Sequence, residues 1–222
     1  YEAESFRGTR AQWLETEGRF PELVAFLAEW VERNPESETA YAQHLSALVR
    51  TGAEEKAFAL MREWIGDAAK VPADGELTVA QQARFRAAVA AAAGQGHQLY
   101  SDRVDARWHA PLAEAARALV ADRRYYSLAG HVLNRWQFIQ TDAGQKMQKD
   151  ALALATAGAA TWAVDHLGFV AGLLNNYPPH ADRAAWVALA DGVRTRWAAE
   201  ADPHQKHRLG AALATLLESR LG

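Results

Sequence analysis

The sequence predicts an all-α fold of about six antiparallel helix hairpins. Residues that favour helix (Ala, Leu, Glu, Arg and Gln) dominate the 222 positions, and no stretch alternates apolar and polar residues long enough to require a strand. The segment TEGRFPELVAFLAEW at 16–30 is restated 34 residues later as RTGAEEKAFALMREW at 50–64. Breaks also recur at regular intervals. Short connections make consecutive helices antiparallel neighbours, and hairpins too small to be stable alone must stack on one another.

The first half of the chain has three clear boundary signals. RNPES at 33–37 ends one helix and offers Ser37 as the next N-cap, DAAKVPADGE at 67–76 is the longest loop-like segment, and Thr78 with Gln81 forms a capping box. We expect helices over 9–17, 20–33, 37–51, 53–66, 78–93 and 97–108.

In the second half, Pro111 is expected to start a helix at its first turn, and NNYPP at 175–179 ends another. ADG at 190–192 resembles a turn, but apolar residues keep helical spacing through it, so one helix is expected there. The expected helices are 110–121, 124–140, 142–157, 159–176, 181–201 and 204–221. They complete a single helical-repeat domain over 1–222, with hairpins at about 1–35, 36–70, 77–108, 110–140, 142–176 and 181–221.

The 34-residue interval resembles that of the tetratricopeptide repeat. That family places a large residue early in the first helix, small residues where the two helices cross, and a glycine near the end of the first helix. The matching positions are Leu14, Gly18, Leu27 and Pro35 in the first hairpin, Tyr41, Leu48, Gly52, Ala57 and Met61 in the second, and Ala151, Leu154, Gly158, Ala163 and Leu167 further on. The resemblance covers about half the chain. It departs from the family at Arg7, Arg10 and His44, and 70–109 fits no 34-residue frame.

The resemblance implies a right-handed α-solenoid that binds a protein or peptide segment on the concave face formed by the first helix of each hairpin. One subset of the family grips a C-terminal carboxylate with Lys and Asn on that face. The corresponding positions of the second hairpin hold Thr39, Ala42, Gln43 and Ser46, so this clamp is not expected.

Composition narrows the choice of function and partner. A net charge of −3 does not indicate a general nucleic-acid binder, and the lack of cysteine excludes disulfides and cysteine-ligated zinc. Residues 1–69 hold 13 Asp/Glu against 7 Lys/Arg. Those charges are either solvated helix faces or an acidic end that favours a basic partner. The longest run free of charged residues and histidine, 151–164, is too short to span a bilayer. Because the chain starts at Tyr1 without an initiator Met, we expect a piece of a longer protein or a processed product, and no compartment is predicted.

No catalytic residue, metal ligand or cofactor is predicted. His204 and His207 share a helix face with Asp202 just before them, but no third convincing ligand follows at helical spacing. The chain has no G-x-S-x-G motif and no phosphate-binding loop, and acidic pairs such as Glu54 and Glu55 lie at helix starts, where the helix dipole favours them.

The eight tryptophans are the most distinctive residues. Trp30 and Trp64 recur in register and are expected to pack between hairpins. Trp108, Trp162 and Trp186 have no repeat partner and are therefore candidates for exposed binding anchors, with the adjacent Tyr125 and Tyr126, which on a helix cannot both face the core.

Three functions remain open. A non-enzymatic scaffold would show a groove lined by exposed aromatic residues, a structural module of a larger protein would show a featureless concave face, and an all-α enzyme would show buried carboxylates and histidines in one deep pocket.

The final segment, 204–221, carries an apolar stripe and is expected to cap the array by packing on the helix around Trp186–Trp197. The stripe consists of Leu209, Ala212, Leu213, Leu216, Leu217 and Leu221.

Overall fold

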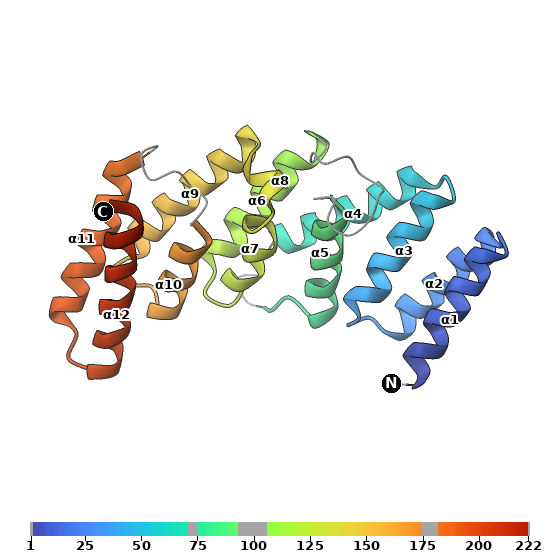
Figure 1. Cartoon of the computed structure of the whole chain (residues 1–222), viewed down its shortest axis with the longest axis horizontal. Helices are drawn as coiled ribbons and strands as arrows, with labels where there is room; N and C mark the ends of the chain where they lie inside the picture. Colours follow the sequence, from blue (N-terminus) through green and yellow to red (C-terminus); the bar gives the residue numbers. More distant parts are fainter. Residues whose placement is uncertain (1, 71–74, 93–105, 175–181, 222) are drawn as a thin grey trace. The chain divides into compact units, whose positions relative to one another are not determined.

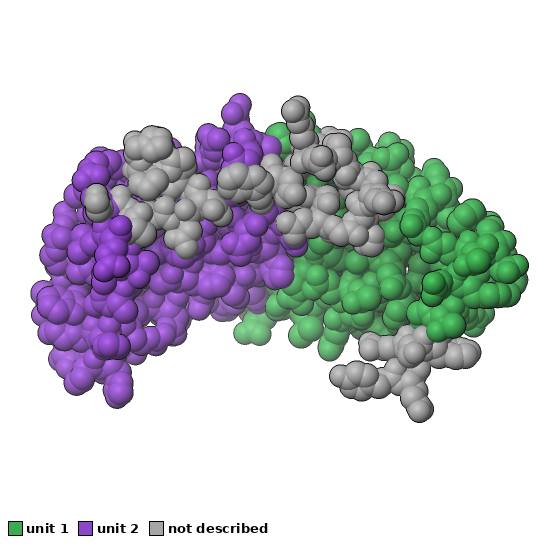
Figure 2. Space-filling model, in the orientation of Figure 1, with its two compact units in different colours: residues 1–111 green, residues 112–222 purple. Residues whose placement is uncertain are grey.

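The computed structural model of the chain describes residues 2–70, 75–92, 106–174 and 182–221. Within these ranges the regular elements are helices and no strand is present, which confirms the predicted all-α class (Figure 1). The chain divides into two compact units, residues 1–111 and 112–222 (Figure 2). Each unit is described by itself.

The first unit is built from five α-helices and a short 3₁₀ segment in its described part. Consecutive helices pack on one another, and α3 also contacts α5, two helices further along the chain. The elements are α1 (Glu2–Thr16), α2 (Phe20–Arg33), α3 (Glu38–Arg50), α4 (Glu54–Ala69), α5 (Val79–Ala92) and η1 (Ala106–Trp108).

The second unit follows the same neighbour pattern. α9 packs on α8, α10 and α11, while α12 packs on α10 and α11. The elements are α6 (His109–Ala121, which begins at the end of the first unit), α7 (Tyr126–Leu133), α8 (Trp136–Ile139), α9 (Asp142–Gly158), α10 (Val164–Leu173), α11 (Arg183–Ala199), α12 (Pro203–Leu216) and η4 (Leu217–Leu221).

Gly18 and Gly52 end α1 and α3 in the same conformation. Their φ angles are +68° and +77°, in the left-handed region that glycine adopts without steric cost. In the first turn the Gly18 and Arg19 amides donate to the carbonyls of Glu15 and Leu14, and 34 residues later Gly52 and Ala53 donate to Val49 and Leu48. Both are Schellman caps. The prediction that the two glycines occupy equivalent places is confirmed.

Other local signals are also confirmed. Ser37 accepts a hydrogen bond from the Ala40 amide, and Thr78 and Gln81 exchange side-chain to backbone hydrogen bonds as a capping box. Helix α11 runs unbroken through 190–192. Pro111 lies in the first turn of α6, where its missing N–H leaves no helical hydrogen bond unmade.

The repeated tryptophans are buried, as predicted. Trp30 is 6% exposed and packs in a cluster of α1, α2 and α3 residues that includes Leu14, Ala40 and Ala47. Trp64 is 5% exposed, and its ring meets the edge of Tyr41 at 5.1 Å. At the predicted crossing positions, Ala57 and Ala151 are buried and Ala163 is half-buried.

Four expected helices need correction. The expected helix 9–17 begins at Glu2. The expected helix 124–140 is two helices, α7 and α8, because at Arg135 the backbone bonds change to the shorter i−3 spacing (to Val132), and the Phe138 amide in turn donates to Arg135. The expected helix 159–176 begins only at Val164, since 159–163 form a turn. The expected helix 97–108 lies largely outside the described residues, and its described end is η1.

The apolar stripe of the final segment is buried only in part. α12 packs on α11, with Leu209 and Leu216 buried, whereas Leu217 is 36% exposed. Ala212, Leu213 and Leu221 are half-buried. The predicted packing of this segment on α11 is therefore confirmed, while its role as a cap remains a prediction.

Candidate functional site

The five aromatic residues proposed as ligand anchors do not share one surface. Trp108 and Trp186 are fully buried, and Tyr125 is 5% exposed. The prediction that Trp108 and Trp186 are exposed is therefore wrong. Both fill cores, and Trp108 meets the edge of Phe58 with ring centroids 5.8 Å apart. Tyr125 is the N-cap of α7, outside the helix, so its direction does not follow the helical spacing assumed for the pair.

Tyr126 and Trp162, by contrast, meet at a shared neighbour, His166. The imidazole stacks on Trp162 with centroids 3.8 Å apart and on Tyr126 with centroids 4.4 Å apart. Phe169 adds an edge contact to Tyr126 at 5.2 Å. Gly158 makes room for this stack, because a Cβ there would lie 2.4 Å from the Trp162 ring. Unlike Gly18 and Gly52, Gly158 is needed for space rather than for a left-handed turn.

His166 is a neutral structural group. It is 1% exposed, and its Nε2 lies 2.7 Å from the Val120 carbonyl, which can only accept, so Nε2 carries the proton. Burial lowers the pKa of His166 below its ordinary value, against the opposing effects of that hydrogen bond and of Asp122. The stack joins α6, α7, α10 and the 159–163 turn.

Beside the stack, the second unit has a groove of about 630 Å³ between α10 and α12. Its walls carry small residues, and a Cβ at Gly168 or Gly172 would meet no atom within 4 Å. Asp165 and Arg208 pair across it. The lining residues are Tyr126, Val164, Asp165, Gly168, Phe169, Ala171, Gly172, Arg208, Ala211, Ala212 and Thr215.

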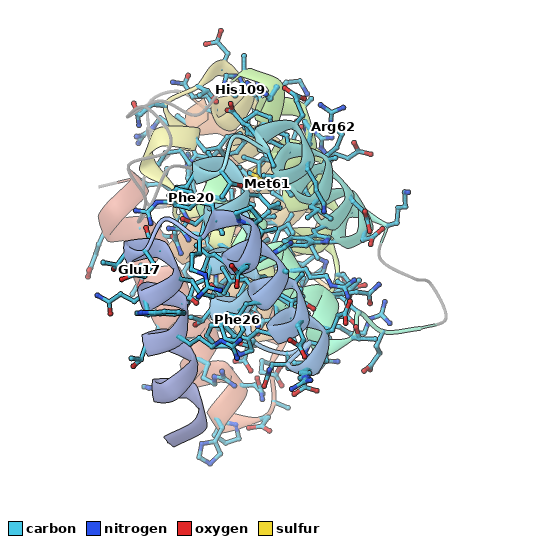
Figure 3. All side chains as sticks on the ribbon, turned by 90° about the vertical axis from the view of Figure 1, so that its right-hand side faces the viewer. Glu17, Phe20, Phe26, Met61, Arg62 and His109 are labelled. Carbon is cyan, nitrogen blue, oxygen red and sulfur yellow. The ribbon has the colours of Figure 1, made fainter. Side chains whose placement is uncertain are left out.

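A smaller groove of about 270 Å³ lies in the first unit between α1 and α3, with α2 behind them. Leu23 and Leu27 of α2 contribute apolar surface, and the two walls contribute mostly polar groups. Figure 1 shows the three helices side by side, and Figure 3 labels Glu17 and Phe20 at the connection between α1 and α2. The lining residues are Gly8, Ala11, Gln12, Glu15, Leu23, Leu27, Gln43, Ser46, Ala47 and Arg50.

This α1/α3 groove coincides with positions singled out by the family resemblance. Gln43 and Ser46 line it, and both were named as concave-face positions of the second hairpin. The sequence reasoning did not name Gln12, Glu15 or Arg50. The 34-residue interval could have found one of them, because Gln12 is the register equivalent of Ser46.

Some polar groups of the groove have a partner among the described residues, and one does not. Glu15 and Arg50 form an ion pair between α1 and α3, and their side chains remain 40% and 50% exposed. The Gln43 Oε1 atom is buried, and no group among the described residues donates a hydrogen bond to it. A buried acceptor without a donor costs free energy, so a donor that reached Gln43 Oε1 would supply a hydrogen bond that the described residues do not make.

Two of the three residues that depart from the family pattern, Arg10 and His44, have contacts or burial that the structure describes. The Arg10 guanidinium lies 4.9 Å from the centre of the Phe26 ring, a cation–π contact between α1 and α2 (Phe26 is labelled in Figure 3). His44 is buried on α3, and burial, with a smaller effect of Lys56, lowers its pKa below the ordinary value. His44 thus lies in the core, whereas Arg10 is exposed to solvent and covers one face of the Phe26 ring.

The described ranges contain no group of three His, Asp or Glu residues placed to hold a metal ion, and His204 is exposed at the start of α12. In these ranges no helix has the length and apolarity that crossing a bilayer requires.

Comparison with known proteins identifies no relative: no family model, curated protein or solved structure matches the chain.

Proposed function

We propose that this chain is a non-enzymatic helical-repeat scaffold, a tetratricopeptide-like α-solenoid that binds a peptide or protein segment. The binding site is the α1/α3 groove. The observation that supports it best is that Gln43 and Ser46, two positions where the family resemblance places the concave face, line a hollow shared with α1. In the proposed pairing, α1 and α3 are the first helices of consecutive hairpins.

The size and chemistry of the groove fit part of a peptide. Small-molecule sites usually enclose roughly 300–1,000 Å³. A groove of about 270 Å³ lies below that range and suits one or two side chains of a longer segment. Amide, hydroxyl and carboxylate groups on its walls can bond a peptide backbone, while Leu23 and Leu27 contribute apolar surface for its side chains.

The α10/α12 groove is not part of this proposal. In the predicted hairpins α10 and α12 are second helices, which line the convex side of such an array. Tyr126 borders that groove, and Trp162 reaches it only through the His166 stack.

The test is a selection of random 12-residue peptides displayed on phage, followed by rebinding of the enriched peptides to variants. Gln12→Trp places a large side chain at the exposed rim of the groove and is expected to abolish rebinding. Gln145→Trp, an equally exposed glutamine on α9, is the matched control and should keep it. Far-ultraviolet circular dichroism establishes that both variants are folded. If the enriched peptides rebind Gln12→Trp as they do the unchanged chain, this groove is not the binding site. If no peptide is enriched, the result favours the alternative that the chain is a structural module of a larger protein.

A further inference from the structure

The α1/α3 groove presents several hydrogen-bond acceptors, and the charges of its own two ionised side chains offset each other. Its lining residues include one carboxylate, Glu15, and one cation, Arg50, which already faces that carboxylate. The buried Gln43 Oε1 adds an acceptor that no described group satisfies.

The backbone adds to this polarity. Gln12 and Glu15 lie in the last two turns of α1, and Ser46 and Arg50 lie in the last two turns of α3. The C-terminal end of a helix carries a partial negative charge, and two such ends meet at the groove. The last turn of α1 contains no basic residue to offset it.

The surrounding chain has the same sign. Residues 1–69 carry 13 Asp/Glu against 7 Lys/Arg, a net charge of −6. Two of these basic residues, Arg19 and Arg33, are already paired with Glu22 and Glu29 on their own helix or its cap. A segment approaching this end of the chain therefore meets a field that attracts cations.

We propose that the segment bound in the α1/α3 groove is basic, and that it presents an arginine to Glu15 and Gln43. This inference rests on the proposed function of the groove. The Glu15–Arg50 pair is exposed, and such pairs contribute little stability, so an incoming cation can share Glu15 at small cost. Arginine is favoured over lysine because its planar guanidinium has five donors and can bond a carboxylate and an amide oxygen together.

The probes are four fluorescent pools of 12-residue peptides with randomised flanks and a fixed central Arg, Lys, Gln or Glu. Binding to the whole chain is measured by fluorescence anisotropy. We expect the order Arg, Lys, Gln, Glu from tightest to weakest, and weaker binding of the Arg pool as salt is raised.

Two groove variants and one matched control locate the effect. Glu15→Gln and Gln43→Leu should each weaken the Arg pool about tenfold, the loss expected for a hydrogen bond to a charged group. Glu29→Gln removes an equally charged, arginine-paired carboxylate on α2 that does not line the groove, and it should leave binding within about twofold.

The outcomes separate this inference from the function on which it rests. If the Gln or Glu pool binds as tightly as the Arg pool and Gln12→Trp still abolishes binding, the groove binds peptides but not basic ones, and the inference is overturned. Equal effects of Glu15→Gln and Glu29→Gln would also overturn it, since general charge would then explain the preference. If no pool binds, the proposed function itself fails.

Discussion

At the scale of single residues, the two repeated glycines tie sequence to conformation most directly. Gly18 and Gly52 have positive φ, and the hydrogen bonds that close their helices are the same at a 34-residue offset. Glycine occurs at both positions because a Cβ would add a steric cost in the left-handed region. Gly158, matched to them by sequence, has a different task, which is to leave room for Trp162.

Replacing Gly18 or Gly52 by Ala should lower the free energy of unfolding by about 1–2 kcal/mol, the cost of a side chain in the left-handed region. A Cβ at either site would meet no atom within 4 Å, so the loss reports backbone strain alone. Urea denaturation measures it. Gly66→Ala is the matched control: its Cβ also meets no atom, but it lies inside α4, where alanine should add about 0.5–1 kcal/mol. Equal stability of the three variants would contradict the left-handed caps.

At the scale of elements, the His166 stack explains how α7, α10 and the 159–163 turn are held together. Two aromatic rings, Trp162 and Tyr126, stack on one buried imidazole, and its hydrogen bond to Val120 adds α6. A neutral histidine can serve this role because it is both a flat ring and a hydrogen-bond donor. Protonation would place a charge in a site where burial already disfavours it.

We therefore expect stability to fall as the pH is lowered through about 6.5, the ordinary pKa of histidine. His166 and His44 have lowered pKa values in the folded chain, so below pH 6.5 the unfolded chain binds protons that the folded chain does not, and unfolding becomes easier. Below pH 6.5, each histidine lowers the free energy of unfolding by at most about 1.4 kcal/mol per pH unit. Urea denaturation between pH 7.5 and about 5 measures the slope.

His166→Gln should reduce this slope while keeping an N–H for the Val120 carbonyl. The control is Phe169→Leu, which trims the same aromatic cluster without removing a titrating group and should leave the slope unchanged. A His166→Gln variant with the wild-type slope would show that His166 does not contribute to the pH dependence.

At the scale of the whole molecule, each compact unit contains its own buried core, and the last helices cover the end of the second one. α12 packs on both α10 and α11 and buries Leu209 and Leu216. That the two units form one repeat domain stays a prediction, as does the solenoid itself. An array of stacked hairpins needs a polar-faced terminal helix to cover its last apolar surface.

Deleting residues 204–222 should then expose the α10 and α11 surfaces under α12 and cause aggregation or loss of the cooperative unfolding transition. Size-exclusion chromatography and thermal denaturation measure these effects. Deleting only 217–222 is the matched control, since Leu217 is exposed and the main apolar contacts of α12 remain. A monomeric 204–222 deletion with an unchanged Tm would mean that α12 is not a cap.

The sequence by itself determined the all-α class, the Ser37 and Thr78–Gln81 caps, and the paired glycine turns. These depend on backbone preferences and on hydrogen bonds between residues at most five apart, which a linear reading contains. The tetratricopeptide resemblance, which stays a prediction, also singled out Gln43 and Ser46, and both line the α1/α3 groove.

Only the tertiary structure decided which aromatic residues are buried and which polar groups meet. Trp108 and Trp186 were expected on the surface and lie in cores, whereas Trp162 folds back over Gly158 to reach His166. Likewise, Glu15 of α1 and Arg50 of α3 are 35 residues apart in the chain and form an ion pair. The burial of a side chain depends on the helices that pack against it, and no local pattern encodes the positions of those helices.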